Sequence, residues 1–439
     1  MQVFNRHVSG RGLTVFGFET MVISGSIFVA AAVHGSLDAA TSSLWRILFI
    51  TALCELCFYY NDLYDLTVVH KKHALVVHLL QAAGAVAIVL AALSILAPGL
   101  LAGHGTFMTA LCVLLVAVPA WRLAFDGVAG APPLEERVLI VGTGSNARTI
   151  AREIEAQHDF AYRLVGVIEP AELTAALSRH HVDRIVVSLD DRRGTLPIRE
   201  LLQAKLSGIR VEDAPTTYER ITGKILIDGI KPSSLIFSDG FRASRATRAV
   251  KRTVDVLLAA VGIALSAPLV LATAMAVRLD SPGPVLYRQE RVGEGGRTFT
   301  LCKFRSMRTD AETGTPIWAT DHDDRVTRIG RFIRLTRLDE LPQLWNVLRG
   351  DMSFVGPRPE RAFFVAQLAE AIPFYTERHV VKPGVTGWAQ VKYRYGSTVE
   401  DAMEKLRYDL YYIKHQSVLF DLSIVVDTVK VIVSAKGAK

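Results

Sequence analysis

Long apolar segments constrain the fold of this chain more than any other feature. Four of them fill the first third of the sequence, at residues 13–33, 44–60, 74–97 and 105–121. Each is close to the roughly 20 residues that a helix needs to cross a bilayer. Half of the 439 residues are hydrophobic, and the mean hydropathy is +0.28. We therefore expect an α-helical membrane protein that begins with a four-span bundle.

Basic residues are distributed unevenly around these segments, which predicts an orientation. The loops at 34–43 and 98–104 contain no Lys or Arg, whereas the other flanks contain Arg6, Arg11, Lys71, Lys72 and Arg122. The positive-inside rule puts both ends of the bundle in the cytoplasm. Arg46 is an exception that can snorkel to the interface. Glu55 is either a functional intramembrane carboxylate or a bundle-facing group bonded to a neighbouring helix. No cleaved signal peptide is expected.

A fifth apolar segment, residues 254–277, has basic residues on both flanks. Arg248, Lys251 and Arg252 precede it, and Arg278 follows it. Ser266 and Pro268 lie at its middle, where a proline removes a helix hydrogen bond and kinks the chain. The sequence predicts a re-entrant helix hairpin over about 248–278, with both ends on the cytoplasmic side. A fifth full span is the alternative.

The region between these membrane segments has the pattern of a small Rossmann-like α/β module. A strand at 137–141 leads into a glycine turn with Gly142, Gly144 and Ala147, and then into a helical pattern. Glu169 follows the next strand, where a carboxylate can reach a ribose. The chain contains no Tyr-x-x-x-Lys pair of the kind that short-chain reductases use. We expect a structural or regulatory module, with nucleotide binding as the open alternative.

Two adjacent carboxylates, Asp339 and Glu340, stand before Pro342, which can begin a helix over 343–349 that Gly350 ends. Free N–H groups at a helix start favour anions, and nearby Arg334 and Arg337 offset the repulsion between the two carboxylates. Such a pair alone is usually a helix cap.

Cations that could complete a phosphate site occur on both sides of this pair. Arg358 lies on a stiff loop between Pro357 and Pro359, which suits bidentate phosphate binding. Lys303 and Arg305 follow a predicted strand at 298–302. Phosphoryl transfer can use one carboxylate as nucleophile, one for Mg²⁺ and a guanidinium on the phosphate.

Other polar features have weaker implications. Asp321 and Asp323 form an Asp-x-Asp that can hold a metal–diphosphate, although a solvated loop is the simpler interpretation. The four cysteines are expected to be small buried hydrophobes rather than disulfides or zinc ligands. The net charge of +7 suits a membrane surface or phosphorylated ligands. We expect no nucleic-acid partner.

Taken together, these motifs resemble the bacterial sugar transferase family, the polyprenyl-phosphate phosphoglycosyl transferases, over about residues 248–433. The resemblance depends on an ordered set of segments at 303–307, 327–330, 338–359 and 382–390. The four N-terminal spans and the α/β module resemble the large form of the family. The expected domains are a bundle (1–128), the Rossmann-like module (129–240) and a mostly α-helical, α+β catalytic domain (241–439).

The resemblance implies transfer of hexose-1-phosphate from a UDP-hexose to undecaprenyl phosphate, with release of UMP, in exopolysaccharide or O-antigen assembly. Asp339 would form a phospho-aspartyl intermediate, and Glu340 would bind Mg²⁺. Phosphate oxygens would contact Arg358, with Lys303, Arg305 and Arg337 as helpers. The enzyme would be multi-pass in the bacterial inner membrane, among membrane lipid, with a cytoplasmic catalytic domain and a homodimer as one option. Glucose ranks slightly ahead of galactose as the sugar. The alternatives are a membrane-anchored nucleotide-sugar oxidoreductase or epimerase that uses the glycine turn, and a non-enzymatic scaffold.

Overall fold

The computed structural model describes most of the chain, and its contacts divide it into two compact units. The first contains His7–Thr217, and the second contains Tyr218–Lys439 together with the short segment Gln2–Arg6. The described residues are 2–3, 6–7, 10–34, 44–61, 63–64, 72–96, 109–110, 112–114, 116–121, 136–156, 162–189, 195–227, 240–241, 244–309, 311, 324–393, 396 and 398–433. Two short strands, β1 (Gln2–Val3) and β2 (Arg6–His7), occur near the start. The predicted limit between residues 128 and 129 lies outside the described residues.

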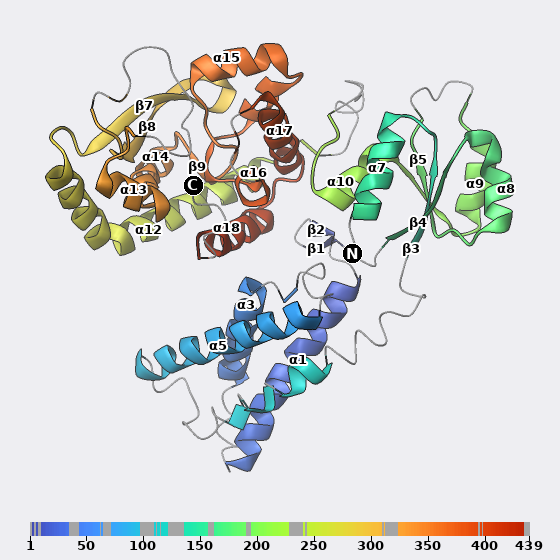
Figure 1. Cartoon of the computed structure of the whole chain (residues 1–439), viewed down its shortest axis with the longest axis horizontal. Helices are drawn as coiled ribbons and strands as arrows, with labels where there is room; N and C mark the ends of the chain where they lie inside the picture. Colours follow the sequence, from blue (N-terminus) through green and yellow to red (C-terminus); the bar gives the residue numbers. More distant parts are fainter. Residues whose placement is uncertain are drawn as a thin grey trace. The chain divides into compact units, whose positions relative to one another are not determined.

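The first unit begins with long apolar helices. Three match the first three apolar segments: α1 (Gly10–Val33), α3 (Leu44–Tyr60) and α5 (Lys72–Leu96) (Figure 1). Thr20 of α1 donates a hydrogen bond to Glu55 of α3, so this carboxylate faces a neighbouring helix. Among the described residues, only α1 and the later helix α12 (Arg245–Asp280) are long and apolar enough to cross a membrane. The four-span bundle therefore stays a prediction.

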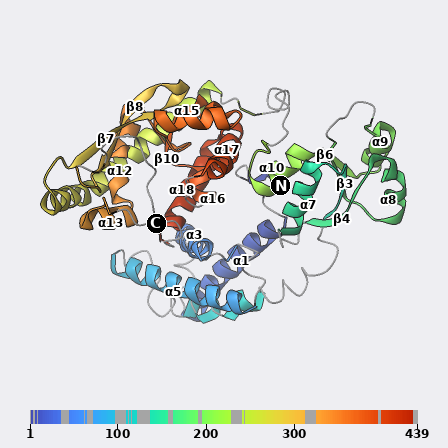
Figure 2. The same cartoon turned by 45° about the horizontal axis from the view of Figure 1, so that its top comes forward.

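An α/β module completes the first unit, as the sequence predicts. Four parallel strands lie in the order β4-β3-β5-β6, and helices cover the sheet (Figure 2). The central strand is fully apolar on both faces at Val138–Val141 because it is buried between strands and helices. The elements are β3 (Glu136–Val141), α7 (Ser145–Ala156), β4 (Tyr162–Ile168), η3 (Pro170–Glu172), α8 (Leu173–Arg179), β5 (Arg184–Val187), α9 (Ile198–Leu206) and β6 (Arg210–Asp213).

The second unit is mostly helical with short strands, in agreement with the predicted α+β class. Strands β7 and β8 form an antiparallel hairpin, and β9 and β10 form a parallel pair. Apart from α12, its elements are α10 (Ala214–Thr222, which begins in the first unit), β7 (Leu286–Val292), η4 (Glu294–Gly296), β8 (Thr298–Phe304), α13 (Arg328–Leu335), η5 (Leu338–Glu340), α14 (Gln343–Arg349), β9 (Ser353–Val355), α15 (Ala362–Ala371), η6 (Tyr375–Val380), β10 (Gly384–Thr386), α16 (Trp388–Lys392), α17 (Val399–Lys414) and α18 (Val418–Val433).

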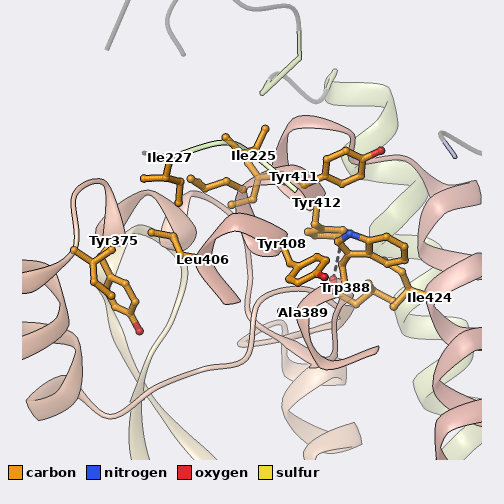
Figure 3. Close-up of a cluster of buried hydrophobic side chains, with 14 of the residues drawn as sticks. Ile225, Ile227, Tyr375, Trp388, Ala389, Leu406, Tyr408, Tyr411, Tyr412 and Ile424 are labelled. Carbon is orange, nitrogen blue, oxygen red and sulfur yellow. Dashed lines mark hydrogen bonds between the residues drawn. The ribbon is translucent and has the colours of Figure 1, made fainter. Parts of the chain in front are cut away.

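Aromatic side chains from α16, α17 and α18 form the main core of this unit around Trp388 (Figure 3). Ile225 and Ile227 are buried in the same cluster, and Trp388 Nε1 donates to the carbonyl of Gly223 at 2.9 Å. The compact unit thus begins at Tyr218, ahead of residue 241, where the sequence suggested a domain start. The segment around Ile225 has no long periodic pattern, so the sequence offered little reason to assign it here.

Helix α12 is a single assigned helix of 36 residues that continues through Ser266 and Pro268. Its first half packs through Ala259 on Leu301 and Val347, and its second half packs through Val277 on Phe304 and Ile333. The opposite face exposes large apolar side chains at Leu257, Val261, Leu265, Leu269, Leu271, Met275 and Leu279. Both halves therefore contact the same folded unit, while an apolar stripe stays uncovered by the described residues.

Candidate active site

Helix α13 is docked against the exit of β8 by a close backbone contact. Thr327 caps α13, and its hydroxyl accepts a hydrogen bond from Gly330 N at 2.9 Å. A Cβ on Gly330 would lie 1.9 Å from the carbonyl oxygen of Ser306. Only glycine fits at this position, because the backbone of the Thr-Arg-Ile-Gly segment packs directly on the backbone of the Lys303–Met307 segment.

The chain reverses between α13 and α14 through the short helix η5, which holds the two carboxylates. Arg337 precedes it with a left-handed φ of 58°, a conformation that non-glycine residues adopt at an energetic cost. The predicted helix after Pro342 is confirmed as Gln343–Arg349, and Gly350 ends it with φ 92°. Asp339 and Glu340 therefore lie between the left-handed Arg337 and the start of α14.

Glu340 lies at the centre of a group of cations. Its Oε1 accepts hydrogen bonds from Lys303 Nζ at 3.0 Å and Arg358 Nη2 at 3.2 Å, and Arg337 Nη1 is 3.9 Å away. Burial would raise the pKa of Glu340, but Lys303 and Arg358 outweigh it and hold the pKa well below its usual range. This carboxylate is therefore ionised at any physiological pH.

Asp339 has a different electrostatic environment from its neighbour. It is 8% exposed, and burial raises its pKa, although the charges of Lys303 and Arg358 oppose the shift and that of Glu340 reinforces it. Two adjacent carboxylates with pKa values displaced in opposite directions are a common feature of active sites. The strongly ion-paired Glu340 is a poor nucleophile, and Asp339 is the carboxylate with the more available electron pair.

Lys303 reaches Glu340 because a buried amide connects β8 to α14. Asn346 of α14 is fully buried, its Oδ1 accepts from Cys302 N at 3.1 Å, and its Nδ2 donates to the carbonyl of Thr300 at 2.7 Å. Burial lowers the pKa of Lys303, while Glu340 favours its charged form. This role of Asn346 was not predicted from the sequence, where its position in the segment that follows the carboxylate pair was the only signal.

The loop that carries Arg358 is held by a buried ion pair. Arg378 Nη2 donates to the carbonyl oxygen of Arg358 at 3.0 Å, while the same guanidinium contacts Asp409 at 2.8 Å and the Tyr375 hydroxyl at 2.7 Å. Sequence reasoning missed all three residues because their partners are distant along the chain.

Glycines allow close backbone contact between the segment that contains Gly356 and Pro357 and the segment that contains Pro383 and Gly384. A Cβ on Gly384 would lie 2.1 Å from Gly356 N, and a Cβ on Gly387 would lie 2.2 Å from the Gly356 carbonyl oxygen. Gly384 N also donates to the carbonyl of Pro357 at 2.9 Å. The Val-Gly-Pro-Arg-Pro and Lys-Pro-Gly-Val-Thr-Gly segments therefore have a shared packing role in positioning Arg358.

The structure thus brings Asp339, Glu340, Lys303, Arg337 and Arg358 together. It does not place Arg305 with them, because its guanidinium donates to the carbonyls of Pro282 and Ser281 at the end of α12.

The other predicted site residues lie elsewhere. Gly142, Gly144, Ala147 and Glu169 belong to the α/β module of the first unit. Asp321 and Asp323 fall outside the described residues. Within the described part of the chain, no group of three or more His, Cys, Asp and Glu side chains is arranged to hold a metal.

Comparisons with known proteins give the class of this site. The profile of the family described as bacterial sugar transferase matches residues 246–435, which include all five of these residues. A putative undecaprenyl-phosphate N-acetylgalactosaminyl 1-phosphate transferase from Bacillus subtilis is 52% identical over 130 residues, 30% of this chain and 73% of the relative. The chain belongs to the bacterial sugar transferase family.

Longer relatives are matched over part of their length. A UDP-N-acetylgalactosamine-undecaprenyl-phosphate N-acetylgalactosaminephosphotransferase from Aeromonas hydrophila is 43% identical over 58% of this chain and 60% of its own. A UDP-glucose:undecaprenyl-phosphate glucose-1-phosphate transferase from Xanthomonas campestris is 46% identical over 42% of this chain and 39% of its own. The match therefore covers less than two thirds of these two proteins, and their names differ in the sugar.

Proposed function

We propose that this protein transfers a hexose-1-phosphate from a UDP-hexose to undecaprenyl phosphate and releases UMP. The observation that carries the proposal is the pair of adjacent carboxylates with opposite electrostatic environments, Asp339 and Glu340, beside Lys303 and Arg358. The names of the relatives supply the donor and acceptor classes. Both glucose and N-acetylgalactosamine occur in those names, so the proposal stops at a hexose.

The reaction proceeds in two displacements at one phosphorus atom. A carboxylate oxygen of Asp339 attacks the β-phosphorus of the UDP-hexose, the bond between that phosphorus and the bridging oxygen breaks, and UMP leaves with the electron pair. A phosphate oxygen of undecaprenyl phosphate then attacks the phospho-aspartyl phosphorus and regenerates the Asp339 carboxylate. Arg358 and Lys303 stabilise the charge that gathers on the phosphoryl oxygens in both steps.

Mg²⁺ fits this chemistry through Glu340. Proteins commonly bind Mg²⁺ with one or two carboxylates while substrate phosphates and waters supply the remaining oxygens, so a larger ligand cluster is not required. The depressed pKa of Glu340 keeps a hard oxygen ligand ionised. When bound there, the ion would neutralise charge on the diphosphate.

Membrane attachment through α12 places this site at the lipid surface. Both halves of α12 pack on the same unit, which supports an arrangement with its two flanks on one side of a membrane. Its exposed apolar stripe, which includes Leu265 at 77% exposure, would then enter the lipid without crossing it. This topology is the proposed re-entrant arrangement. It keeps Asp339 in the cytoplasm, within reach of both a soluble UDP-hexose and a lipid phosphate.

UMP release tests the proposed reaction directly. The purified full-length chain is incubated with undecaprenyl phosphate and, in turn, UDP-glucose, UDP-galactose and UDP-N-acetylgalactosamine. One donor should release UMP in proportion to the lipid-linked product. If no donor releases UMP while the protein stays folded, the transferase proposal fails. Release of UMP without a lipid product would indicate hydrolysis instead.

Labelling from outside the cell tests the topology. Single cysteines replace Ser281 and Ala246, near the two ends of α12, in a background that lacks the native cysteines. Neither should react with an impermeant thiol reagent in intact cells, and the exposed Ala246→Cys site should react after the membrane is opened. Reaction of Ser281→Cys from outside would mean that α12 spans the bilayer.

A further inference from the structure

The α/β module contains a cavity that the transfer reaction does not use. It has a volume of about 690 Å³ and is lined by the segments that follow β3, β4 and β5, including Gly142–Gly144, Glu169–Ala171 and Ser188–Leu189. Cavities of 300–1,000 Å³ are typical small-molecule sites. All of its lining residues belong to the first unit, so it is separate from the carboxylate pair.

Its position in the sheet is the one where parallel α/β folds bind ligands. The strand order β4-β3-β5-β6 means that the chain moves in opposite directions from β3, first to β4 and then to β5. Ligands bind outside the carboxyl ends of the strands at such a switch point. Gly142 and Ser188, which directly follow β3 and β5, line the cavity there.

The glycine turn has the backbone geometry of a phosphate site. Gly142 has φ +117°, and a Cβ at this position would lie 2.2 Å from the carbonyl oxygen of Ser188. The turn leads directly into α7, a helix of 12 residues, whose first N–H groups have no partner within the helix. Ala147 is fully buried, which allows α7 to pack closely on the sheet. An anion in the cavity would meet the positive end of α7.

Two polar side chains in the wall fit a sugar hydroxyl rather than a second anion. Glu169 follows β4, and its Oε1 accepts a hydrogen bond from the Thr143 hydroxyl at 2.5 Å, so the carboxylate is fixed at the cavity edge. Ser188 is 4% exposed, and its Oγ has no hydrogen-bond partner among the residues that the structure describes. A buried hydroxyl without a hydrogen-bond partner lowers the stability of the fold unless a ligand or a water molecule forms a hydrogen bond with it.

We propose that this cavity binds a ribonucleotide, with its phosphate at the Gly142–Ser145 turn and its ribose hydroxyls on Glu169. The chemistry is shared by free nucleotides of different bases and by the nucleotide part of a larger cofactor. The site is a binding site only: the sequence contains no Tyr-x-x-x-Lys pair, and no redox step is assigned to it. The proposal does not depend on the transferase reaction.

A cavity-filling variant with a matched control tests the site in the full-length chain. Ala171 is exposed and lines the cavity, whereas Ala175, four residues further on, is exposed and does not line it. Ala171→Trp should block the cavity, and Ala175→Trp should leave it open. The probes are the four ribonucleoside 5′-monophosphates, NAD and inorganic phosphate, measured by equilibrium dialysis. At least one ribonucleotide should bind wild type and Ala175→Trp equally and bind Ala171→Trp at least about tenfold more weakly.

The proposed contact between Glu169 and the ribose hydroxyls is tested by a separate binding measurement. The best ribonucleotide should bind wild type about tenfold more tightly than its 2′-deoxy analogue, and Glu169→Gln should reduce that preference because a carboxylate is the stronger acceptor. Uracil and adenine probes distinguish a product-related ligand from an adenine cofactor.

Three results would overturn the proposal. The first is that Ala171→Trp weakens the binding of no ribonucleotide more than Ala175→Trp does. The second is that only inorganic phosphate binds, and the third is that wild type does not prefer the ribonucleotide to its 2′-deoxy analogue. UMP release by Ala171→Trp, measured in parallel, tells a failure of this site apart from a failure of the transferase proposal. If the variant melts below Ala175→Trp, the smaller Ala171→Leu replaces it under the same criteria.

Discussion

Replacement of Asp339 by Asn should abolish transfer without unfolding the protein. The change keeps the shape of the side chain and removes the attacking electron pair. Loss of a covalent residue typically costs at least about 10⁴-fold in rate, equivalent to roughly 5.5 kcal/mol of transition-state stabilisation. Glu340 cannot take over the role, because Lys303 and Arg358 hold its Oε1 at 3.0 and 3.2 Å.

The same substitution should leave stability equal or slightly higher. The pKa of Asp339 is raised in the folded protein by burial, despite the nearby cations. A raised pKa means that the folded state binds the proton more tightly than the unfolded state, so ionised Asp339 opposes folding above that pKa. A neutral Asn removes this cost near neutral pH, although the cations lose one of their two carboxylates. The melting temperature of Asp339→Asn should therefore stay at or above that of wild type.

Two measurements decide whether Asp339 is the nucleophile. UMP release gives the rate, and a UDP-hexose labelled on its β-phosphorus, supplied without lipid acceptor, gives the covalent intermediate. Wild type should retain label on the protein and Asp339→Asn should retain none. Glu370→Gln, on the exposed face of α15, is the control for loss of a carboxylate and should behave as wild type. UMP release by Asp339→Asn within tenfold of wild type, or label still attached to it, would refute the assignment.

Two further predictions concern the contacts of Glu340 and Lys303, and a third concerns where the folded unit begins. Glu340→Gln should lose the response of the rate to Mg²⁺ in a titration, and full wild-type activity in EDTA would exclude the ion. A pH profile of UMP release should be bell-shaped, because burial raises the pKa of Asp339 and lowers that of Lys303; Lys303→Arg should extend the alkaline limb, and an unchanged limb would exclude Lys303 as its source. A chain that begins at Ala214 should fold and release UMP, whereas one that begins at Arg242 should not. The chain that begins at Arg242 lacks the buried side chains of Ile225, Leu226 and Ile227, which contribute about 4–9 kcal/mol in total. Equal melting temperatures of the two shortened chains would contradict this account.

The sequence was sufficient to predict those features that local pattern determines. The helix after Pro342, its end at Gly350 and the α/β order around Gly142 follow from turn chemistry and periodicity, and the structure has them. Arg305 shows where this approach fails. It lies two residues after Lys303, so strand alternation puts both on one face, but β8 ends at Phe304 and the chain turns away. The side chain then satisfies carbonyls at the end of α12, a contact that no local pattern encodes.

Residues that support the site could not be predicted because their partners are remote. Arg378 stabilises the loop of Arg358 through its main chain and pairs with Asp409, 31 positions further along the chain. A single sequence contains no signal that relates these positions. Their burial also works against prediction, because charged residues are rarely buried and are by default assigned to the surface.

Polar residues on the first turns of α12 connect the proposed membrane helix to the site. Arg252 donates to the carbonyls of Val347 and Leu348 at the end of α14, at 2.6 and 2.8 Å. Asp255 accepts from Phe354 N at 3.0 Å in β9, the strand that leads to Arg358. One helix therefore contacts both the end of α14, whose start follows Glu340, and the strand that precedes Arg358. The same helix carries the exposed apolar stripe. In the proposed topology, the depth of α12 in the lipid therefore sets the height of the carboxylate pair above the membrane surface. In the proposed topology, the helix that attaches the protein to the membrane therefore also positions the carboxylate pair near the phosphate of the proposed lipid acceptor.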